Sequence, residues 1–346
     1  MHALLLLFLL SGDDMLGPED YAKIIDQSKL HYKVIMEPSK TPAPVLNCPR
    51  RDESTRLVTE AGKRKLVAWT VKLEALKLLN EGEKFYQAKD FDGAAERFRA
   101  GIAADPQAVP GYFFYGDALL FGKKDPEAAL AQYRKGMALD PSMPTGHFFA
   151  SSALVMLGRP DEAREEIIKA LTYYPGYESI WKTAELSVDR WNIKPVKRFK
   201  FEPPEGFNGS GKNGIDIYAG PDFEWVGYAM CKAVWANEPR FAKSHRADSW
   251  TLEEERACVL NQFMASLNMV QPALIKKGKK VTEEDVLAAL PPRDRHISDV
   301  SRDGLLDGYI LFEVIGQHCP IGLSLLDDES LKQIDAYIRK YVIVAR

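Results

Sequence analysis

The chain has 346 residues, which is long enough for two domains or for one domain joined to a repeat array. Its 46% hydrophobic and 27% charged residues are typical of a globular protein and exclude a wholly disordered chain, a collagen-like fibre and a coiled coil. A formal net charge of -3 gives no basic field, so nucleic acid is not expected as the main partner. The four cysteines lack any C-x-x-C spacing, which excludes a zinc ribbon and a thioredoxin-type motif; they are Cys48, Cys231, Cys258 and Cys319.

The N-terminus begins with an unbroken apolar run, Leu4 to Leu10, followed by the small residues Ser11 and Gly12. This pattern predicts a signal peptide over residues 1–12 that is too short to span a bilayer, although Met1 to Ala3 carry no Lys or Arg. The expected location is therefore periplasmic or secreted, where disulfides form. The alternatives are a buried N-terminal strand or helical turn and a cytoplasmic protein.

Residues 13–65 are predicted to be an N-terminal segment of mixed order. Pro18 to Ser28 has the apolar spacing of a helix, and Leu30 to Met36 alternates like a strand. Pro38 to Pro49 is expected to be a connector interrupted by prolines. No catalytic constellation occurs in this segment.

Residues 66–190 form a helix-rich array with internal self-similarity. Four sets of positions recur at spacings of 34 or 35 residues: Ala94, Ala129, Ala163; Phe98, Tyr133, Ile167; Gly101, Gly136, Ala170; and Pro106, Pro141, Pro175. Phe85, Leu119 and Leu154 are spaced 34 and then 35, which places one extra residue of the second unit in the turn 122–125. Small residues let two antiparallel helices approach, the ring fills the gap beside them, and the proline ends each unit.

These residues resemble the tetratricopeptide repeat (TPR), whose period is about 34 residues and whose pattern joins small residues, aromatics and a closing proline. The best match is "GEKFYQAKDFDGAAERFRAGIAADP", with echoes in "GDALLFGKKDPEAALAQYRKGMALDP" and "SSALVMLGRPDEAREEIIKALTYYP". The resemblance covers residues 75–177 and implies a mainly α fold of about three helical hairpins that stack into a superhelix. Trp181, Ala184 and Val188 repeat the first-helix spacing without a second half, as a capping helix would.

Residues 191–346 are predicted to form a mostly helical C-terminal domain with a small β element, and we recognise no family in them. A basic, strand-like segment from Lys194 to Phe201 precedes a Gly-rich loop at 206–214 and a short strand at 214–220. Helix starts are marked by capping residues, and the last helix is expected to end near Val344. These caps are Thr251 with Glu254, Thr282 with Asp285, and Asp327 or Asp328.

The Gly-rich loop spells G-x-x-x-x-G-K from Gly206 to Lys212, but Asn213 stands where a phosphate-binding loop needs Ser or Thr. The loop follows Pro203-Pro204 and leads into a strand instead of a helix, so it is interpreted as a hairpin-like loop and no nucleotide or other cofactor is predicted.

Metal and nucleophile chemistry find little support. No three His, Cys or carboxylate ligands share a ligand spacing, so no metal site is predicted, and His245 and His296 are interpreted as exposed loop histidines. No G-x-S-x-G motif occurs. Cys231 and Cys258 lie among apolar helical neighbours and are interpreted as small buried residues or as part of a disulfide between neighbouring helices.

Two charged features are assigned structural roles. The run Glu253 to Glu255 is expected in the first turn of a helix, where carboxylates stabilise the macrodipole. The basic clusters Lys194 to Lys200 and Lys276 to Lys280 are interpreted as solvated linkers, with contact to an acidic partner or a lipid surface as the alternative.

The TPR resemblance implies a concave groove lined by the first helix of each unit. Its predicted lining is Leu79, Glu83, Tyr86, Phe113, Asp117, Leu120, Phe148, Ser152 and Val155. The alternative is that the C-terminal region of the chain covers this groove. The Lys, Asn and Arg clamp by which some TPR proteins hold a terminal carboxylate is missing, because the matching positions carry Leu79, Glu83, Phe114, Thr145 and Phe149.

The sequence therefore predicts a non-catalytic interaction or assembly module. Its partner would be an apolar or amphipathic segment of another protein, with a basic residue facing Glu83 or Asp117. Nucleic acid and a membrane span are not expected, and the oligomeric state is not predicted. Two alternatives stay open: an enzyme whose C-terminal domain carries the chemistry while the repeats recruit substrate, and a purely structural array.

Overall fold

The computed structural model describes residues 15–37, 55–203, 207–210, 214–221, 224–245, 250–275 and 281–346. The predicted signal peptide at 1–12, the connector at 38–49 and the basic cluster at 276–280 lie outside these residues. Where the chain is described it is mostly helical, as the fold-class prediction states, and it contains two small sheets.

The chain divides into two compact units, each assembled from two separate segments. One unit, which we call the sheet unit, comprises Met1–Cys48 and Phe199–His318. The other, the repeat unit, comprises Pro49–Arg198 and Cys319–Arg346. This division differs from the expected boundaries at residues 66 and 191. The chain begins in the sheet unit, passes through the repeat unit, returns to the sheet unit and ends in the repeat unit.

The sheet unit begins with the two elements predicted near the N-terminus. Helix α2 (Pro18–Gln27) starts with Pro at its first position, where the missing N–H costs nothing, and strand β1 (His31–Ile35) follows. Its remaining elements are β4 (Phe207–Ser210), β5 (Gly214–Tyr218), α10 (Val226–Asn237), η3 (Pro239–Phe241), α11 (Leu252–Ile275), α12 (Glu283–Ala289), α13 (Pro292–Arg302), α14 (Leu306–Tyr309), η4 (Ile310–Ile315) and α15 (Gly316–His318).

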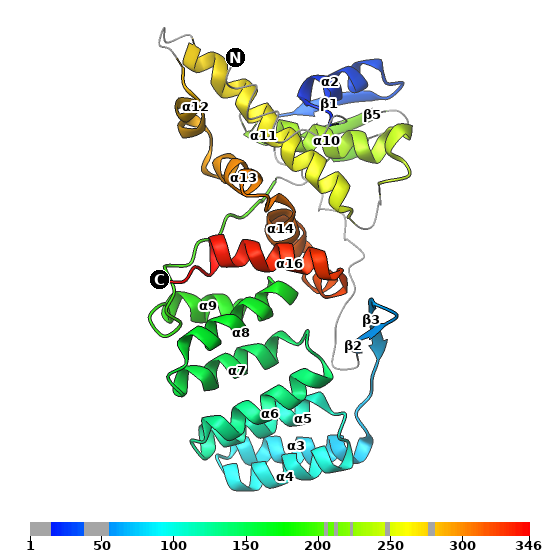
Figure 1. Ribbon diagram of the computed structural model, residues 1–346. Coiled ribbons are helices and arrows are strands. Elements are labelled where there is room, and N and C mark those ends of the chain that lie inside the picture. The colour runs from blue at the N-terminus through cyan, green and yellow to red at the C-terminus, as the bar shows by residue number, and fades with distance from the viewer. Residues whose placement is uncertain are drawn as a thin grey trace. The chain divides into compact units, whose positions relative to one another are not determined.

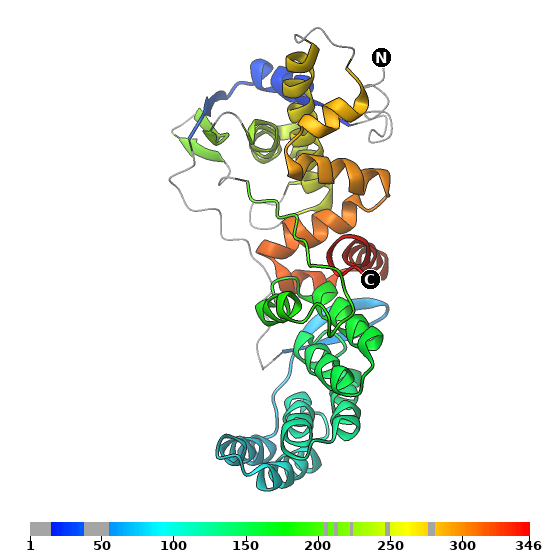
Figure 2. The same ribbon diagram turned by 90° about the vertical axis from the view of Figure 1, so that its left-hand side faces the viewer.

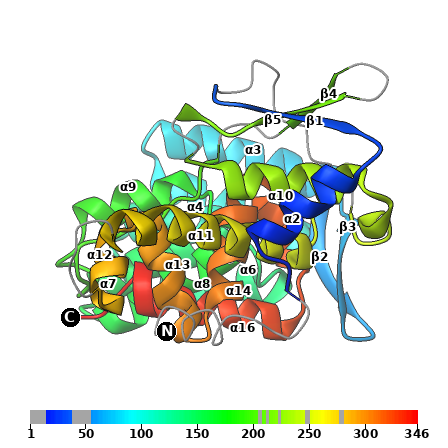
Figure 3. The same ribbon diagram turned by 90° about the horizontal axis from the view of Figure 1, so that it is seen from above.

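Its three-stranded sheet has the order β1-β5-β4, with β1 parallel and β4 antiparallel to β5. The antiparallel pair frames the Gly-rich loop, and β5 follows the loop directly, which confirms a hairpin in place of a phosphate-binding loop. Helix α10 packs on one side of the sheet (Figure 3). Ile215 and Ile217 of β5 form a buried cluster there with Ala229 and Ala233 of α10. The expected strand over 194–201 is wrong, since residues 194–203 are all described and form none.

Helix α11 is the core of the sheet unit, because Cys258–Leu267 are buried without interruption around the whole helix. It packs closely on α10, where a Cβ atom on Gly227 would lie 2.7 Å from the Asn261 carbonyl oxygen. The predicted caps hold: the Thr251 hydroxyl accepts from the Glu254 N–H at 3.2 Å, and Thr282 and Asp285 form a capping box.

The repeat unit contains the predicted helical hairpins, stacked in chain order (Figure 1, Figure 2). Each hairpin consists of a first helix and a second helix, which pack against each other. The first helices are α3, α5 and α7, and they pair with the second helices α4, α6 and α8 in that order. They are α3 (Leu73–Gln87), α4 (Phe91–Ala104), α5 (Val109–Asp117), η1 (Ala118–Gly122), α6 (Pro126–Leu139), α7 (Pro144–Met156), α8 (Pro160–Tyr173) and α9 (Glu178–Leu186). Ala94, Ala129 and Ala163 are fully buried where each pair meets, as the spacing predicts.

The extra residue of the second hairpin is taken up inside the first helix as well as its turn. Segment η1, Ala118–Gly122, is a π-helix that continues α5. The Asp125 N–H reaches back to the Leu119 carbonyl, whereas the corresponding bonds, from Asp90 to Phe85 and from Arg159 to Leu154, span one residue fewer. A π-bulge absorbs one inserted residue while the flanking turns stay in register.

A β-hairpin that the sequence analysis missed precedes the array. Strands β2 (Thr55–Glu60) and β3 (Lys63–Ala68) are joined by Ala61 and Gly62, both at positive φ. The usual Asn-Gly signal for this turn is absent, since Ala stands at the first position. The Leu57 N–H donates to Asp140 at 3.2 Å, so the hairpin is tied to the turn between α6 and α7.

The C-terminal segment completes the end of the array. It forms η5 (Pro320–Leu325), α16 (Asp328–Tyr337) and η6 (Ile338–Val342), and Asp327 caps α16 by accepting from the Ser330 N–H at 2.8 Å. These elements contact α8 (Figure 1). The Arg339 guanidinium donates two hydrogen bonds of 2.7 Å to Glu165. The segment that follows the capping helix α9 also meets the C-terminal end of the chain, because Ile193 and Ala345 form a β-bridge.

Candidate binding face of the repeat unit

The side chains of α3, α5, η1, α7 and α9 that do not pack against second helices form what we call the first-helix face. Repeat symmetry places equivalent positions of these helices side by side, and α3 contacts α5 as α5 contacts α7. Glu83, Asp117, Ser152 and Leu186 occupy one such set of positions.

Three of the nine predicted lining residues lie in the core instead. Leu79, Phe113 and Leu120 are at most 3% exposed. Leu79 packs where Gly101 and Gly111 leave room, and Phe113 does the same at Gly136 and Gly146. Because glycines on the next helices let these large side chains sink between hairpins, their register position does not bring them to the surface.

The other six predicted residues are half-buried on the first helices. Phe148 meets the ring of Tyr177 edge-on at 5.9 Å, and Tyr86 meets Phe91 edge-on at 5.3 Å. Ser152 donates to the Phe148 carbonyl at 3.2 Å, and Glu83 accepts from Gln87 at 3.3 Å. Val155 and Asp117 complete the set.

Asp117 is the electrostatically unusual member. The Tyr133 hydroxyl donates to its Oδ1 atom at 2.6 Å. Burial raises the pKa of this carboxyl to about 6, the bond from Tyr133 opposes the shift, and the charge of Glu83 adds to it. The pKa of Tyr86 is raised by burial and by both carboxylates, so these groups of α3 and α5 lie within electrostatic reach of one another.

The sequence analysis missed the most exposed apolar side chains of this face. These are Leu73, Leu76, Phe121, Met156 and Leu186, which are 41% to 87% exposed. Phe121 and Met156 each lie four residues beyond a predicted lining residue, Asp117 and Ser152. The helical i, i+4 relation is therefore the signal that could have found them.

The alternative in which the chain's own C-terminus fills the groove can be tested within the repeat unit. Here α16 and η6 contact α8, a second helix, and the five apolar side chains keep their exposure. The C-terminal segment of this unit therefore does not cover the first-helix face.

His296 is buried and His245 is half-buried, so their interpretation as exposed loop histidines is wrong. His296 lies on α13, stacks on Phe199 with ring centroids 3.5 Å apart, and has its pKa lowered to about 3 by burial. His245 contacts Glu254 at 2.9 Å. His318 is half-buried on α15.

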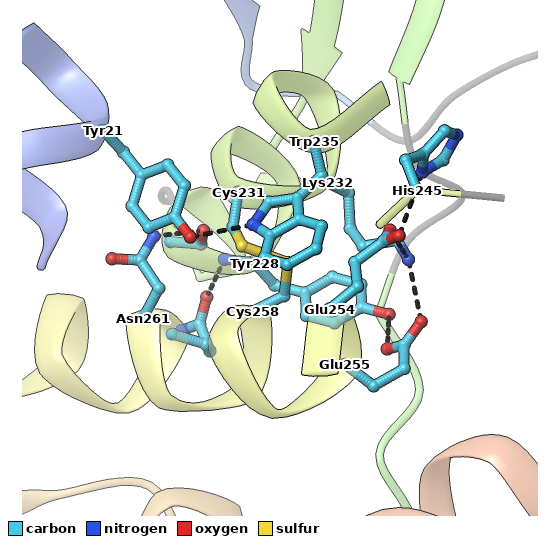
Figure 4. The surroundings of a disulfide bond; sticks show 12 residues. Tyr21, Tyr228, Cys231, Lys232, Trp235, His245, Glu254, Glu255, Cys258 and Asn261 are labelled. Atoms are coloured by element: carbon cyan, nitrogen blue, oxygen red, sulfur yellow. Dashed lines mark hydrogen bonds and ion pairs between the residues drawn. A yellow bond between two sulfur atoms is a disulfide. The ribbon is translucent and has the colours of Figure 1, made fainter. Parts of the chain in front are cut away.

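Glu254 and Glu255 do lie in the first turn of α11, as predicted, but both are buried (Figure 4). Lys232 of α10 contacts both carboxylates, with 2.7 Å to Glu255, and the Tyr228 hydroxyl donates to Glu255 at 2.8 Å. This network lies beside a disulfide between Cys231 and Cys258, which joins α10 to α11 (Figure 4). The disulfide is one of the two interpretations that the sequence left open for these cysteines.

In the described part of the chain no group of three or more His, Cys, Asp or Glu side chains is arranged to hold a metal ion. None of the helices among the described residues is both long and apolar enough to cross a membrane.

Stacked helical hairpins with small residues at their contacts define a helical-repeat protein. A family model described as "Tetratricopeptide repeat" matches residues 79–144 and 119–178. Residues 79–178 therefore consist of tetratricopeptide repeats.

Some solved structures are similar to part of the chain at low identity. The first TPR domain of human RPAP3 is 21% identical, with a TM-score of 0.31, and the match covers 34% of this chain and 96% of that one. The Yersinia enterocolitica chaperone SycD, in complex with a peptide of the translocator YopD, is 17% identical with a TM-score of 0.31, covering 34% and 88%. Yeast Sti1 TPR2B is 19% identical with a TM-score of 0.31, covering 35% and 94%. No curated protein sequence matches the chain.

Proposed function

We propose that the first-helix face binds an apolar or amphipathic segment of another protein, and that the chain is an interaction or assembly module. The observation that carries the proposal is the placement of exposed apolar side chains. In the described part of the repeat unit, every large hydrophobic residue that is strongly exposed lies on a first helix and none on a second helix. Apolar side chains gathered on one face mark a site of contact with another molecule.

The charge on this face selects against one class of partner. Glu83 and Asp117 would repel an acidic peptide tail. A segment that lays apolar side chains over Phe121 and Met156 and brings no acidic group to α3 and α5 fits best.

The test uses peptides of about 15 residues selected from a random display library on the full chain, with affinities measured by fluorescence anisotropy. Phe121→Asp and Met156→Asp each place a charge on the face without disturbing the core, because both side chains are about half exposed. Each is expected to weaken binding about tenfold or more, since burial of such a side chain is worth roughly 1.5–3 kcal/mol.

The matched controls are Ala103→Asp and Ala131→Asp, exposed positions on the second helices α4 and α6. These variants should bind within about twofold of the wild type. A library that yields no binder, or binders that tolerate Phe121→Asp and Met156→Asp, would refute the proposal.

We further propose that the sheet unit has no catalytic role. Both buried carboxylates of α11 are already engaged by Lys232, Tyr228 and His245, which favours an internal network that fixes α11 against α10. Glu254→Gln is then expected to lower thermal stability. If instead it abolished a hydrolytic or transfer activity of the purified chain while leaving the melting temperature unchanged, the enzyme alternative would replace this proposal.

We propose that the protein is periplasmic or secreted. The Cys231–Cys258 disulfide supports this, because such bonds persist in oxidising compartments. N-terminal sequencing of the protein from its native compartment is expected to begin beyond Gly12, and an intact Met1 would contradict export.

A further inference from the structure

We infer that the segment bound by the first-helix face carries a Lys or Arg side chain held by Asp117 and Glu83, and that protonation of Asp117 releases it. This inference rests on the binding role proposed above. It adds the chemistry of the anchoring residue and the condition under which the contact fails.

The carboxylate of Asp117 has a fixed position and a second negative charge close to it, which favours binding of a cation. Its Oδ1 atom accepts from Tyr133, whose ring is fully buried and fixes the carboxyl group in place. Glu83 on the adjacent first helix adds a second negative charge. Among the described residues, no Lys, Arg or His forms an ion pair with either carboxylate, so no cation of the described chain pairs with their charges.

Other carboxylates of the repeat unit, unlike Asp117, form ion pairs within the chain. Glu166 contacts His147 at 2.6 Å, Glu165 is held by Arg339 at 2.7 Å, and Asp92 lies 3.1 Å from Lys123. Asp117 therefore stands out as a partly buried carboxylate whose burial is opposed only by one hydroxyl. A partly buried charge that lowers the stability of the free protein is typical of a site that binds a ligand of opposite charge.

Apolar side chains flank the two carboxylates along their own helices. Phe121 lies about one turn beyond Asp117, and Leu76 lies about two turns before Glu83. A cationic side chain between two apolar ones would therefore meet complementary surface on both sides. This is the pattern of an amphipathic segment with a single basic residue in its apolar stripe.

Few groups influence the charge of the Asp117 carboxyl. Helix α3 contributes Glu83 and Tyr86, and α6 contributes Tyr133. Two cationic or titratable groups on other helices that contact α5 have partners of their own: His147 of α7 bonds to Glu166 and to the Pro141 carbonyl, and Arg97 of α4 pairs with Glu81. Tyrosines stay neutral between about pH 5 and 8, so the carboxyl of Asp117 is the group that changes charge there.

Burial raises the pKa of Asp117 to about 6, so the free protein holds the carboxylate at neutral pH and loses it in mild acid. A bound cation favours the carboxylate and lowers its pKa. Binding and protonation therefore compete, and the affinity should fall as the pH drops below about 6.

The experiment sequences the binders from a random library of peptides of about 15 residues displayed on phage and selected on the full chain near neutral pH. We expect enrichment of one Lys or Arg between apolar residues. For a chosen binder, the dissociation constant should rise about tenfold between about pH 7.5 and pH 5, and about tenfold at pH 7.5 for Asp117→Asn, which should show no further rise in acid.

Asp161→Asn is the control, because Asp161 is an exposed carboxylate paired with Arg164 on α8, and it should leave the affinity and its pH dependence unchanged. Binders that depend on Phe121 but lack a basic residue, or that bind Asp117→Asn as tightly as the wild type, would overturn this inference and leave the proposed function standing. Binders indifferent to Phe121→Asp would overturn the proposed function itself.

Discussion

Asp117 lies at the end of α5, and only the Tyr133 hydroxyl compensates its partial burial within the chain. The pKa of its carboxyl is raised to about 6 from 3.8, which means that the folded repeat unit prefers the protonated form. A raised carboxyl pKa contributes stability that is fully present below the unfolded pKa and is lost as the pH rises through the folded pKa. At neutral pH this side chain therefore destabilises the fold.

Replacing Asp117 by Asn should raise the free energy of unfolding at about pH 7.5 by roughly 1 to 3 kcal/mol, since a shift of one pKa unit corresponds to about 1.4 kcal/mol. The gain should shrink as the pH falls through about 6 and vanish below about pH 3, where wild-type Asp117 is protonated in both states. Urea denaturation across this range measures it, and a gain that is constant with pH would show that the charge is not its source.

At the same scale, sequence reasoning identified which residues recur but not how deep each one lies. Leu79 and Phe148 share a register position, yet Leu79 is buried against Gly101 and Gly111 while Phe148 is half-exposed. The burial of a side chain depends on the size of the residues on the neighbouring helices. The apolar pattern of a single helix gives no information about that size. Glu83 and Asp117 were expected on this face, and both are half-buried at equivalent positions of α3 and α5.

At the scale of elements, the helices of the array were predictable because small residues and capping signals recur. The capping helix α9 was also expected from Trp181 and Ala184, and both are buried. The docking of α16 and η6 on α8 was not expected, because no periodic signal links α8 to a segment so much later in the sequence. The π-helical η1 is a similar case, since the sequence shows one extra residue but not whether a turn or a helix absorbs it.

The docking of the C-terminal segment on α8 is expected to depend on apolar packing more than on its ion pairs. Ile338 is fully buried, so Ile338→Ala should lower the free energy of unfolding by roughly 2 to 4 kcal/mol. Arg339 holds Glu165 and Asp335 with its side chain 40% exposed, so Arg339→Ala should cost at most about 1 kcal/mol. Denaturant titrations of both variants compare them directly, and a larger loss for Arg339→Ala would reverse this ranking.

At the scale of the whole molecule, the sequence suggested a simple order of domains that the chain does not follow. Strand β1 pairs in parallel with β5, His31 opposite Gly214, so the repeat array is inserted within the sheet unit. Parallel strands require a crossover connection, and here that connection contains all of the helical hairpins. A strand of five residues carries no information about so distant a partner, which explains why the N-terminal segment was treated as separate.

This inserted arrangement makes the Cys231–Cys258 disulfide a selective probe of one unit. The bond closes a loop with a sequence separation of 27, and both sulfur-bearing side chains are fully buried between α10 and α11. Constraint of a loop of this size stabilises a fold by about 3 kcal/mol. Because α11 is the core of the sheet unit, replacing both cysteines by Ala should increase hydrogen exchange in α10 and α11.

The helices α4 and α6 provide the internal control, since they belong to the repeat unit and make no use of this bond. Hydrogen exchange followed by mass spectrometry on the full chain should show faster exchange across Val226–Asn237 and Leu252–Ile275, with rates in α4 and α6 unchanged. An equal acceleration in all four helices would mean that the two units open together. Unchanged exchange in α11 would mean that the buried network of Lys232, Glu254 and Glu255 holds the helices without the disulfide.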